Sequence, residues 1–168
     1  MPISWPSAPI VSGPLTVKDE WIDYNGHLNM AYYNVLFDQA VDDAFIKLGL
    51  GLDYVKQRQA SFFTAEVHVC YLRELEAGMP VAVSLQLIEF DSKRAHFFQE
   101  LRHAEDGWLS ATSEQMSLHV NLSARKVAPW PDDILANLTG LAHAHASLPR
   151  PERAGRAIGI KRGSSTTA

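Results

Sequence analysis

The chain has 168 residues, of which 46% are hydrophobic and 20% are charged, and its formal net charge is −4. These values are typical of one soluble domain that is long enough to bury a core. No apolar run approaches the roughly 18 residues of a membrane-spanning helix, and the first residues lack a signal-peptide pattern. Cys70 is the only cysteine, so no internal disulfide forms, and we expect a cytoplasmic protein that does not bind membranes.

Charge and composition divide the chain into three parts. In residues 139–168 the basic side chains Arg150, Arg153, Arg156, Lys161 and Arg162 stand against Glu152 alone. The rest of the chain is therefore acidic, which argues against nucleic acid as a partner. The Ala, Ser, Pro and Gly content of 139–168 predicts a flexible basic tail. Prolines near the N-terminus predict an extended arm over 1–11, which leaves 12–138 as the folded domain.

Hydrophobic periodicity predicts one long helix over residues 30–48. A short strand over 15–18 precedes it, and a short helix over 52–59 follows. The stripe of the long helix consists of residues spaced three or four apart: Met30, Tyr33, Phe37, Ala40, Val41, Ala44 and Leu48. Asn29 is a favourable N-cap, and Gly49 is favourable just after the helix.

From residue 61 the period changes to 2, which predicts strands over 61–72, 80–90, 94–103 and 108–121, joined by short turns. This pattern is typical of an antiparallel meander. In the last strand, Met116, Leu118 and Val120 share an apolar face with Glu114, whose carboxylate we expect to pair with a group such as an arginine. Residues 132–138 predict one or two further helical turns. The fold class is therefore α+β, with the long helix wrapped by a curved antiparallel sheet.

The loop before the long helix holds a dense set of polar side chains. Asp23, Asn25, His27 and Asn29 alternate with other residues and lead directly into the helix. A helix N-terminus has unpaired N–H groups and the positive end of the macrodipole, so this is a place to hold an oxyanion. Turn and cap roles are the alternative for these side chains. Gly26 permits either a close substrate approach or a plain Asn-Gly turn.

This arrangement resembles the hotdog-fold acyl-CoA thioesterases of the 4-hydroxybenzoyl-CoA thioesterase type. The shared pattern is a strand, the Asp-x-Asn-x-His-x-Asn loop of residues 23–29, a long helix and a four-stranded meander. Residues 114–121, Arg125 and the Pro129-Trp130-Pro131 segment resemble a subgroup near the betainyl-CoA thioesterases of carnitine breakdown. The resemblance implies a homodimer or homotetramer whose sites lie between protomers. It also implies hydrolysis of an acyl-CoA without metal or cofactor, coenzyme A being part of the substrate.

The resemblance also assigns catalytic roles. Asp23 would act as nucleophile or general base, and the backbone N–H near Met30 would polarise the thioester carbonyl. Asn25 and His27 would lie beside Asp23, where His27 could orient it, donate to the carbonyl or protonate the leaving thiolate. A further glutamate assists in plant acyl-carrier-protein thioesterases. Glu74 is its closest local match here, with Glu66 as the alternative.

A betaine head group is a quaternary ammonium, which favours the faces of aromatic rings. The expected substrate-binding residues are Tyr24, Gly26, Asn29, Tyr33, Phe63 and Glu66. Candidates for the CoA phosphates are Arg73, Lys93, Arg94, Arg125 and Lys126. Neither His68 nor His119 has metal-ligand spacing, so we expect no metal site.

Two other functions stay open. The first is an enoyl-CoA hydratase of the same fold, although its motif has a proline and one more residue before the histidine, and both are missing from Asn25-Gly26-His27. The second is a non-catalytic acyl-CoA-binding module. Asp23 at the entrance of the helix argues for an enzyme.

Overall fold

One antiparallel sheet forms the scaffold of the computed structural model, which describes residues 3–160. Its strand order is β1-β3-β4-β5-β2, and the short β6 pairs with β5. The strands are β1 (Ile10–Thr16), β2 (Ala60–Tyr71), β3 (Pro80–Phe90), β4 (Arg94–His103), β5 (Leu109–Asn121) and β6 (Lys126–Val127). Within residues 3–160, β2 pairs only with β5, so it lies at the end of the sheet. The expected meander is therefore wrong for β2, which does not lie beside β3.

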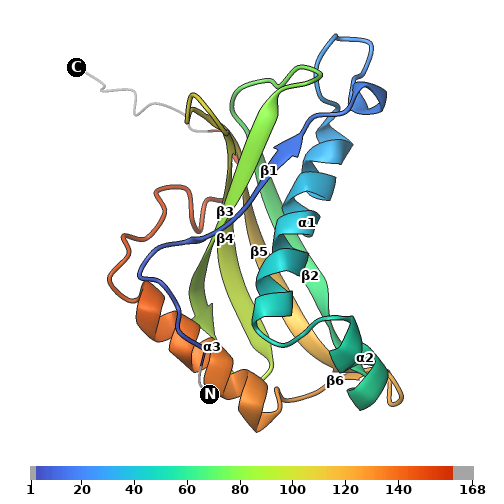
Figure 1. Cartoon of the computed structure of the whole chain (residues 1–168), viewed down its shortest axis with the longest axis vertical. Coiled ribbons are helices and arrows are strands. Elements are labelled where there is room, and N and C mark those ends of the chain that lie inside the picture. Colours follow the sequence, from blue (N-terminus) through green and yellow to red (C-terminus); the bar gives the residue numbers. More distant parts are fainter. Residues whose placement is uncertain (1–2, 161–168) are drawn as a thin grey trace, which may run out of the picture.

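Helix α1 (Met30–Lys47) runs along one face of the curved sheet (Figure 1). Helix α3 (Asp132–His145) lies at the end of the molecule where α1 ends (Figure 1). A short 3-10 turn η1 (Asp19–Trp21) precedes α1, and α2 (Leu52–Arg58) follows it. A long helix wrapped by a curved antiparallel sheet is the hotdog fold, so the expected fold class is confirmed. Among the described helices, none combines the length and apolar character needed to cross a bilayer.

The predicted stripe of α1 forms the centre of the core. Leu36, Phe37, Ala40 and Ala44 are at most 1% exposed, and they pack against the apolar faces of β3 and β4. Those faces match the sequence pattern: Val81, Val83, Leu85, Leu87, Ala95, Phe97 and Leu101 are all buried. Met30 departs from the stripe, because as the first helical residue it lies at the open end of the sheet and is 65% exposed.

Strand β5 turns polar side chains toward α1, contrary to the face expected from sequence. Ser113, Gln115 and Ser117 are buried, whereas Met116 and Leu118 lie on the outer face. Burial is possible for Gln115 because its amide donates to Oε1 of Gln99 at 2.9 Å and to Oγ of Ser113 at 3.0 Å. Most of the buried polar groups of this strand are thus hydrogen bonded.

The outer face is covered by the segment after α3. There the carboxylate of Glu114 accepts from Nε2 of His96 at 2.7 Å and from the Gly155 N–H at 2.8 Å. Its partners are therefore a histidine and the backbone, and the expected arginine partner is wrong. The amide of Gln86 donates to the Pro149 carbonyl at 3.2 Å, so this segment crosses the sheet at more than one point.

Strand β2 contains a bulge between Thr64 and Glu66. Before the bulge, Phe62 stacks on Phe45 of α1 with ring centroids 4.1 Å apart, so Phe63 points to the outer side. After the bulge the alternation is shifted by one residue, and Tyr71 lies opposite the buried Ala111 on the α1 side.

Helix α3 continues beyond residue 138, where the folded domain was expected to end, and reaches His145. Leu141 and His145 are buried, and packing of this additional helix on the core explains why it persists. Nδ1 of His145 accepts from the Leu87 N–H at 3.0 Å, and Nε2 donates to the Ala8 carbonyl at 3.1 Å. Strand β1 also begins at Ile10, inside the expected arm. Residues 161–168 of the expected tail lie outside the described residues.

Candidate active site

The Asp23–Asn29 loop is a tight turn closed by its own backbone. The Gly26 N–H donates to the Asp23 carbonyl at 2.9 Å, and the Asp23 N–H donates to the His27 carbonyl at 3.1 Å. Gly26 has φ of +87°, and an added Cβ would meet no atom within 4 Å. The glycine therefore serves the left-handed turn, and no other described part of the protein approaches it closely.

Asp23 combines a turn role with a free oxygen. Its Oδ1 accepts from the Asn25 N–H at 2.8 Å, which is an Asx turn. No hydrogen bond within residues 3–160 uses its Oδ2, so one carboxylate oxygen is available to substrate or water.

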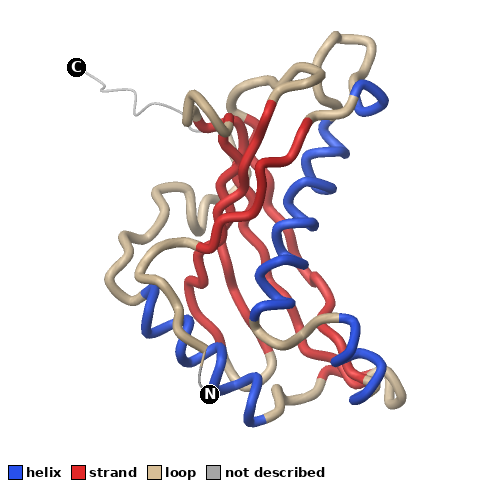
Figure 2. Tube along the Cα trace, viewed as in Figure 1, coloured by secondary structure: helices blue, strands red, loops and turns tan. Residues whose placement is uncertain are grey.

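Buried neighbours hold this loop against the rest of the fold. The Leu28 N–H donates to the Leu75 carbonyl at 2.7 Å, and the Asn29 N–H donates to the Trp21 carbonyl at 3.0 Å. Leu28, Leu75 and Trp21 are all buried. The loop before α1 and the loop after β2 therefore lie side by side at the same end of the molecule (Figure 2).

The first turn of α1 provides an unused donor. Oδ1 of Asn29 caps the helix by accepting from the Ala31 N–H at 3.0 Å, and the Tyr32 N–H donates to the Asn29 carbonyl. In the described part of the chain the Met30 N–H donates to no acceptor. It lies at the positive end of the helix dipole, where a developing negative charge is stabilised.

A cleft of about 550 Å³ opens at this helix end. Its lining residues include Asp23, Tyr24, Asn25, His27, Asn29, Met30, Tyr33, Tyr71, Arg73 and Glu74. The structure thus brings together all four residues expected to be catalytic, and three of those expected to bind substrate. Their chemical roles stay predictions. Gly26 is exposed in the turn between Asn25 and His27 and is not part of the lining.

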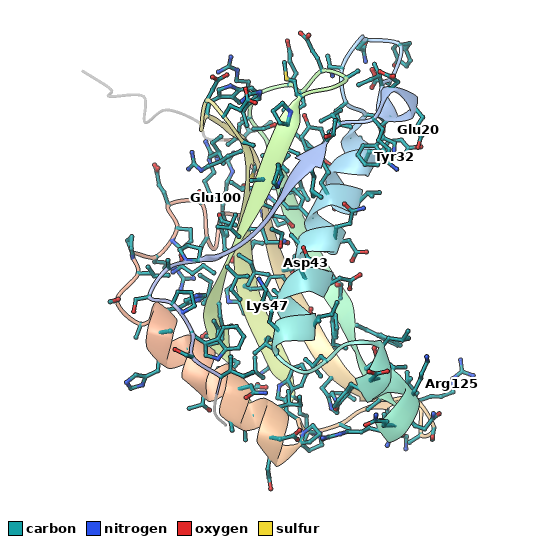
Figure 3. All side chains as sticks on the ribbon, viewed as in Figure 1. Glu20, Tyr32, Asp43, Lys47, Glu100 and Arg125 are labelled. Carbon is teal, nitrogen blue, oxygen red and sulfur yellow. The ribbon has the colours of Figure 1, made fainter. Side chains whose placement is uncertain are left out.

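Phe63 and Glu66 lie away from the cleft. Phe63 lines a second groove of about 650 Å³ together with Leu118 and Arg125. Figure 3 shows Arg125 at the opposite end of the molecule from Tyr32 of the first turn of α1. Glu66 lies opposite Met116 on the outer face of the sheet. Of the two glutamates weighed from sequence, Glu74 is the one in the cleft.

Tyr71 was missed by sequence reasoning, although it is the last residue of a predicted strand. Its hydroxyl donates to the Met30 carbonyl at 3.1 Å, which fixes the first turn of α1 from the sheet side. Its ring meets that of Tyr33 edge to face, with centroids 5.0 Å apart and an interplanar angle of 78°. The bulge in β2 decides which side Tyr71 faces, and no sequence signal places that bulge.

The wall formed by residues 71–74 also carries opposite charges. The Arg73 guanidinium lies 3.9 Å from the centroid of the Trp108 ring, within cation–π distance. Burial raises the pKa of the Tyr33 phenol, and the charge of Glu74 adds to this rise. Within residues 3–160, no group of three His, Cys, Asp or Glu side chains is placed to hold a metal ion.

The sequence of this chain is similar to those of known thioesterases. The profile of the thioesterase-like superfamily matches residues 17–138. A betainyl-CoA thioesterase from Pseudomonas aeruginosa is 41% identical over 144 residues, covering 86% of this chain and 91% of that protein. An L-carnitine dehydrogenase/betainyl-CoA thioesterase from Rhizobium meliloti is 39% identical over 156 residues, or 90% of this chain. The match spans only 31% of that longer protein.

The fold of this chain is also similar to those of solved structures. A hypothetical protein from Staphylococcus aureus, solved in complex with CoA, has a TM-score of 0.81 and 31% identity, covering 95% of this chain and 99% of that one. A 1,4-dihydroxy-2-naphthoyl-CoA thioesterase from Synechocystis has a TM-score of 0.66 and 16% identity, covering 86% and 98%. At that identity the second likeness shows the fold alone.

Proposed function

We propose that this chain, which belongs to the thioesterase-like superfamily, hydrolyses the thioester bond of a small acyl-CoA. The observation that carries the proposal is the pairing of a free carboxylate oxygen on Asp23 with the unused Met30 N–H across one cleft. Acyl transfer to water needs both a nucleophile or base and a donor for the oxyanion. The two parts come from one loop and the helix it enters.

Two routes of hydrolysis fit this geometry. In one, Asp23 removes a proton from water as the water oxygen bonds to the acyl carbon. In the other, the Asp23 carboxylate bonds to that carbon, and water then cleaves the anhydride. In both, the carbon–sulfur bond breaks, the carbonyl oxygen gains negative charge facing the Met30 N–H, and the thiolate takes up a proton. His27 lines the same cleft and is the nearest candidate donor for that proton.

The acyl group we propose is betainyl. The support is the name of the Pseudomonas aeruginosa relative, which aligns over 91% of its length. The proposed reaction uses no metal and no cofactor, because Asp23 and the Met30 N–H supply the nucleophile or base and the electrophilic donor. The site of action we propose is the cytoplasm, where a free thiol such as Cys70 stays reduced.

We also propose that the protein works as a homo-oligomer, either a dimer or a tetramer. One edge of strand β2 pairs with no other strand in the described part of the chain. Along β2, Phe63, Val67 and Tyr71 are 55%, 43% and 43% exposed. A long edge with exposed apolar residues favours pairing with a second copy. Antiparallel pairing of two β2 strands would place the groove at Phe63 and Arg125 of one copy beside the cleft of the other. Light scattering should then give at least twice the mass of one chain.

The test of hydrolysis is thiol release from betainyl-, short-chain, long-chain and aryl-CoA. Asp23→Asn keeps the acceptor for the Asx turn but removes the negative charge. We expect its turnover to fall by about 10²-fold or more, a loss of roughly 2.7 kcal/mol of transition-state stabilisation. Asp19→Asn is the matched control, since Asp19 is exposed in η1 and does not line the cleft.

Three other results would contradict this proposal. Hydration of an enoyl-CoA faster than thioester cleavage would identify a hydratase. Tight binding of CoA esters without thiol release would identify a binding module. An Asp23→Asn variant as active as wild type would mean that Asp23 acts only in the turn.

A further inference from the structure

Two tyrosine rings that contact each other are part of the lining of the cleft. The Tyr71 hydroxyl donates to the Met30 carbonyl at 3.1 Å. The Tyr33 side chain is 4% exposed, so the surrounding core holds its ring in place. The two rings meet edge to face, 5.0 Å apart. Because its hydroxyl is anchored and its ring packs on the buried Tyr33, the Tyr71 ring, which is 43% exposed, offers a preorganised aromatic surface.

The charge of the cleft is negative close to these rings. Asp23 and Glu74 both line it. Glu74 lies near enough to the Tyr33 phenol for its charge to help raise the pKa of that group. Arg73 is the one guanidinium in the lining, and it lies 3.9 Å from the Trp108 ring. That contact draws the positive charge toward Trp108, which is not part of the lining.

A quaternary ammonium has no N–H to donate, so a protein recognises it by ring faces and by a nearby negative charge rather than by hydrogen bonds. In a betainyl ester a single methylene separates the ammonium from the reacting carbonyl carbon. The group that binds the ammonium must therefore lie next to the catalytic groups. Tyr24 also lines the cleft, but it is 98% exposed, whereas Tyr71 is held by Met30 and by the Tyr33 ring. Tyr71 and Glu74 are therefore the lining residues that best offer this chemistry beside Asp23 and Met30.

We infer that Glu74, together with the Tyr71 ring that Tyr33 supports, binds a quaternary ammonium in the acyl group and so determines the specificity of the cleft. The inference rests on the proposed thioester hydrolysis and names the residues that select its substrate. Glu74 acts here by binding the cation, and the bond-breaking steps are left to Asp23. This differs from an assisting role in the chemistry, which would affect every ester alike.

The test compares two esters of the same shape. Betainyl-CoA carries a trimethylammonium, and 3,3-dimethylbutanoyl-CoA replaces the charged nitrogen by carbon. We expect wild type to prefer the cationic ester in kcat/KM. In Glu74→Gln the ratio of the two kcat/KM values should fall by about tenfold. The reason is that the variant loses one charge–charge contact with the ammonium but keeps the size and shape of the side chain. Glu76→Gln is the matched control, being an exposed carboxylate outside the cleft lining, and it should leave the ratio unchanged.

The aromatic part of the inference has its own variants. Tyr71→Phe keeps the ring and removes the hydroxyl, whereas Tyr71→Leu removes the ring face. The preference for the cationic ester should survive in the first and fall in the second. Thermal denaturation of both variants shows whether each remains folded.

Three outcomes would overturn the inference: a wild type that prefers the neutral ester, a Glu74→Gln variant that loses activity equally on both esters, or a Tyr71→Leu variant with the wild-type ratio. If wild type releases thiol from neither ester, the proposed hydrolysis fails instead. Equilibrium binding of the two esters then still decides the inference. Equal affinity of wild type for both would contradict it, and tighter binding of the cationic ester that is lost in Glu74→Gln would support it.

Discussion

Replacing Met30 by proline removes one atom group from the proposed site, the N–H that faces the developing oxyanion. Met30 is the first residue of α1, the helical position that tolerates proline best because its N–H has no partner within the helix. Asn29 has φ of −63° and ψ of 140°, an extended conformation that a following proline accepts. The Met30 side chain is 65% exposed, so its loss exposes little new surface.

These features predict a folded protein with a specific catalytic defect. Removing one oxyanion donor costs about 10²–10³-fold in kcat, or about 2.7–4 kcal/mol. The free energy of unfolding should change by less than about 1 kcal/mol, because no hydrogen bond of the helix is lost. The assay is kcat for thiol release from betainyl-CoA, with thermal denaturation run in parallel.

Met30→Ala is the matched control, since it shortens the side chain and keeps the N–H. Its kcat should stay within about twofold of wild type, as expected for an exposed side chain. A folded Met30→Pro variant with wild-type kcat would refute the oxyanion role of this amide. Equal losses in Met30→Pro and Met30→Ala would refute it as well, because the side chain would then be responsible.

Three further predictions concern stability. Leu138 of α3 is fully buried, so Leu138→Ala should lower the free energy of unfolding in urea by about 2–5 kcal/mol; a loss near zero would contradict the packing of α3. Asn29→Ala removes the side-chain cap that accepts from the Ala31 N–H and should lower the free energy of unfolding by about 1 kcal/mol. Asn29→Ser keeps a capping oxygen, so its melting temperature should stay close to that of wild type. Burial lowers the pKa of His145 below its ordinary 6.5, so the unfolded state binds more protons and stability should decrease as the pH falls below about 6.5. Wild type should have a larger free energy of unfolding than His145→Asn, and this difference should be smaller at about pH 5.5 than at about pH 7.5. A difference that does not depend on pH would contradict the lowered pKa of His145.

The long helix and its apolar stripe could be predicted because their signals are local. Asn29 caps α1 as expected, and the helix begins at Met30 as predicted. Spacing in the Asp23–Asn29 loop was also sufficient to locate the cleft, since a loop that enters a helix must lie at the helix N-terminus. The same loop contains its own turn hydrogen bonds, so the turn role and the proposed catalytic role of Asp23 coexist.

Features that depend on long-range contacts could not be predicted from the sequence pattern. Gln115 of β5 is buried because Gln99 of the neighbouring strand accepts a hydrogen bond from its amide. Hydrophobicity alone predicts instead that Met116 and Leu118 face the core. The bulge in β2 places Phe63 and Tyr71 on opposite faces, whereas strict alternation of residues would put them on the same face. Helix α3 extends beyond residue 138 because Leu141 finds a place in the core, which its own sequence does not reveal.

The most direct test of the proposed function measures binding and turnover separately in Asp23→Asn. The substitution keeps the turn at Asn25 and changes only the charge that we assign to the chemistry. The account predicts that betainyl-CoA still binds with an affinity within about threefold of wild type, while kcat falls by about 10²-fold or more. Wild-type turnover in a folded Asp23→Asn variant would contradict it, and so would a loss of binding as large as the loss of turnover.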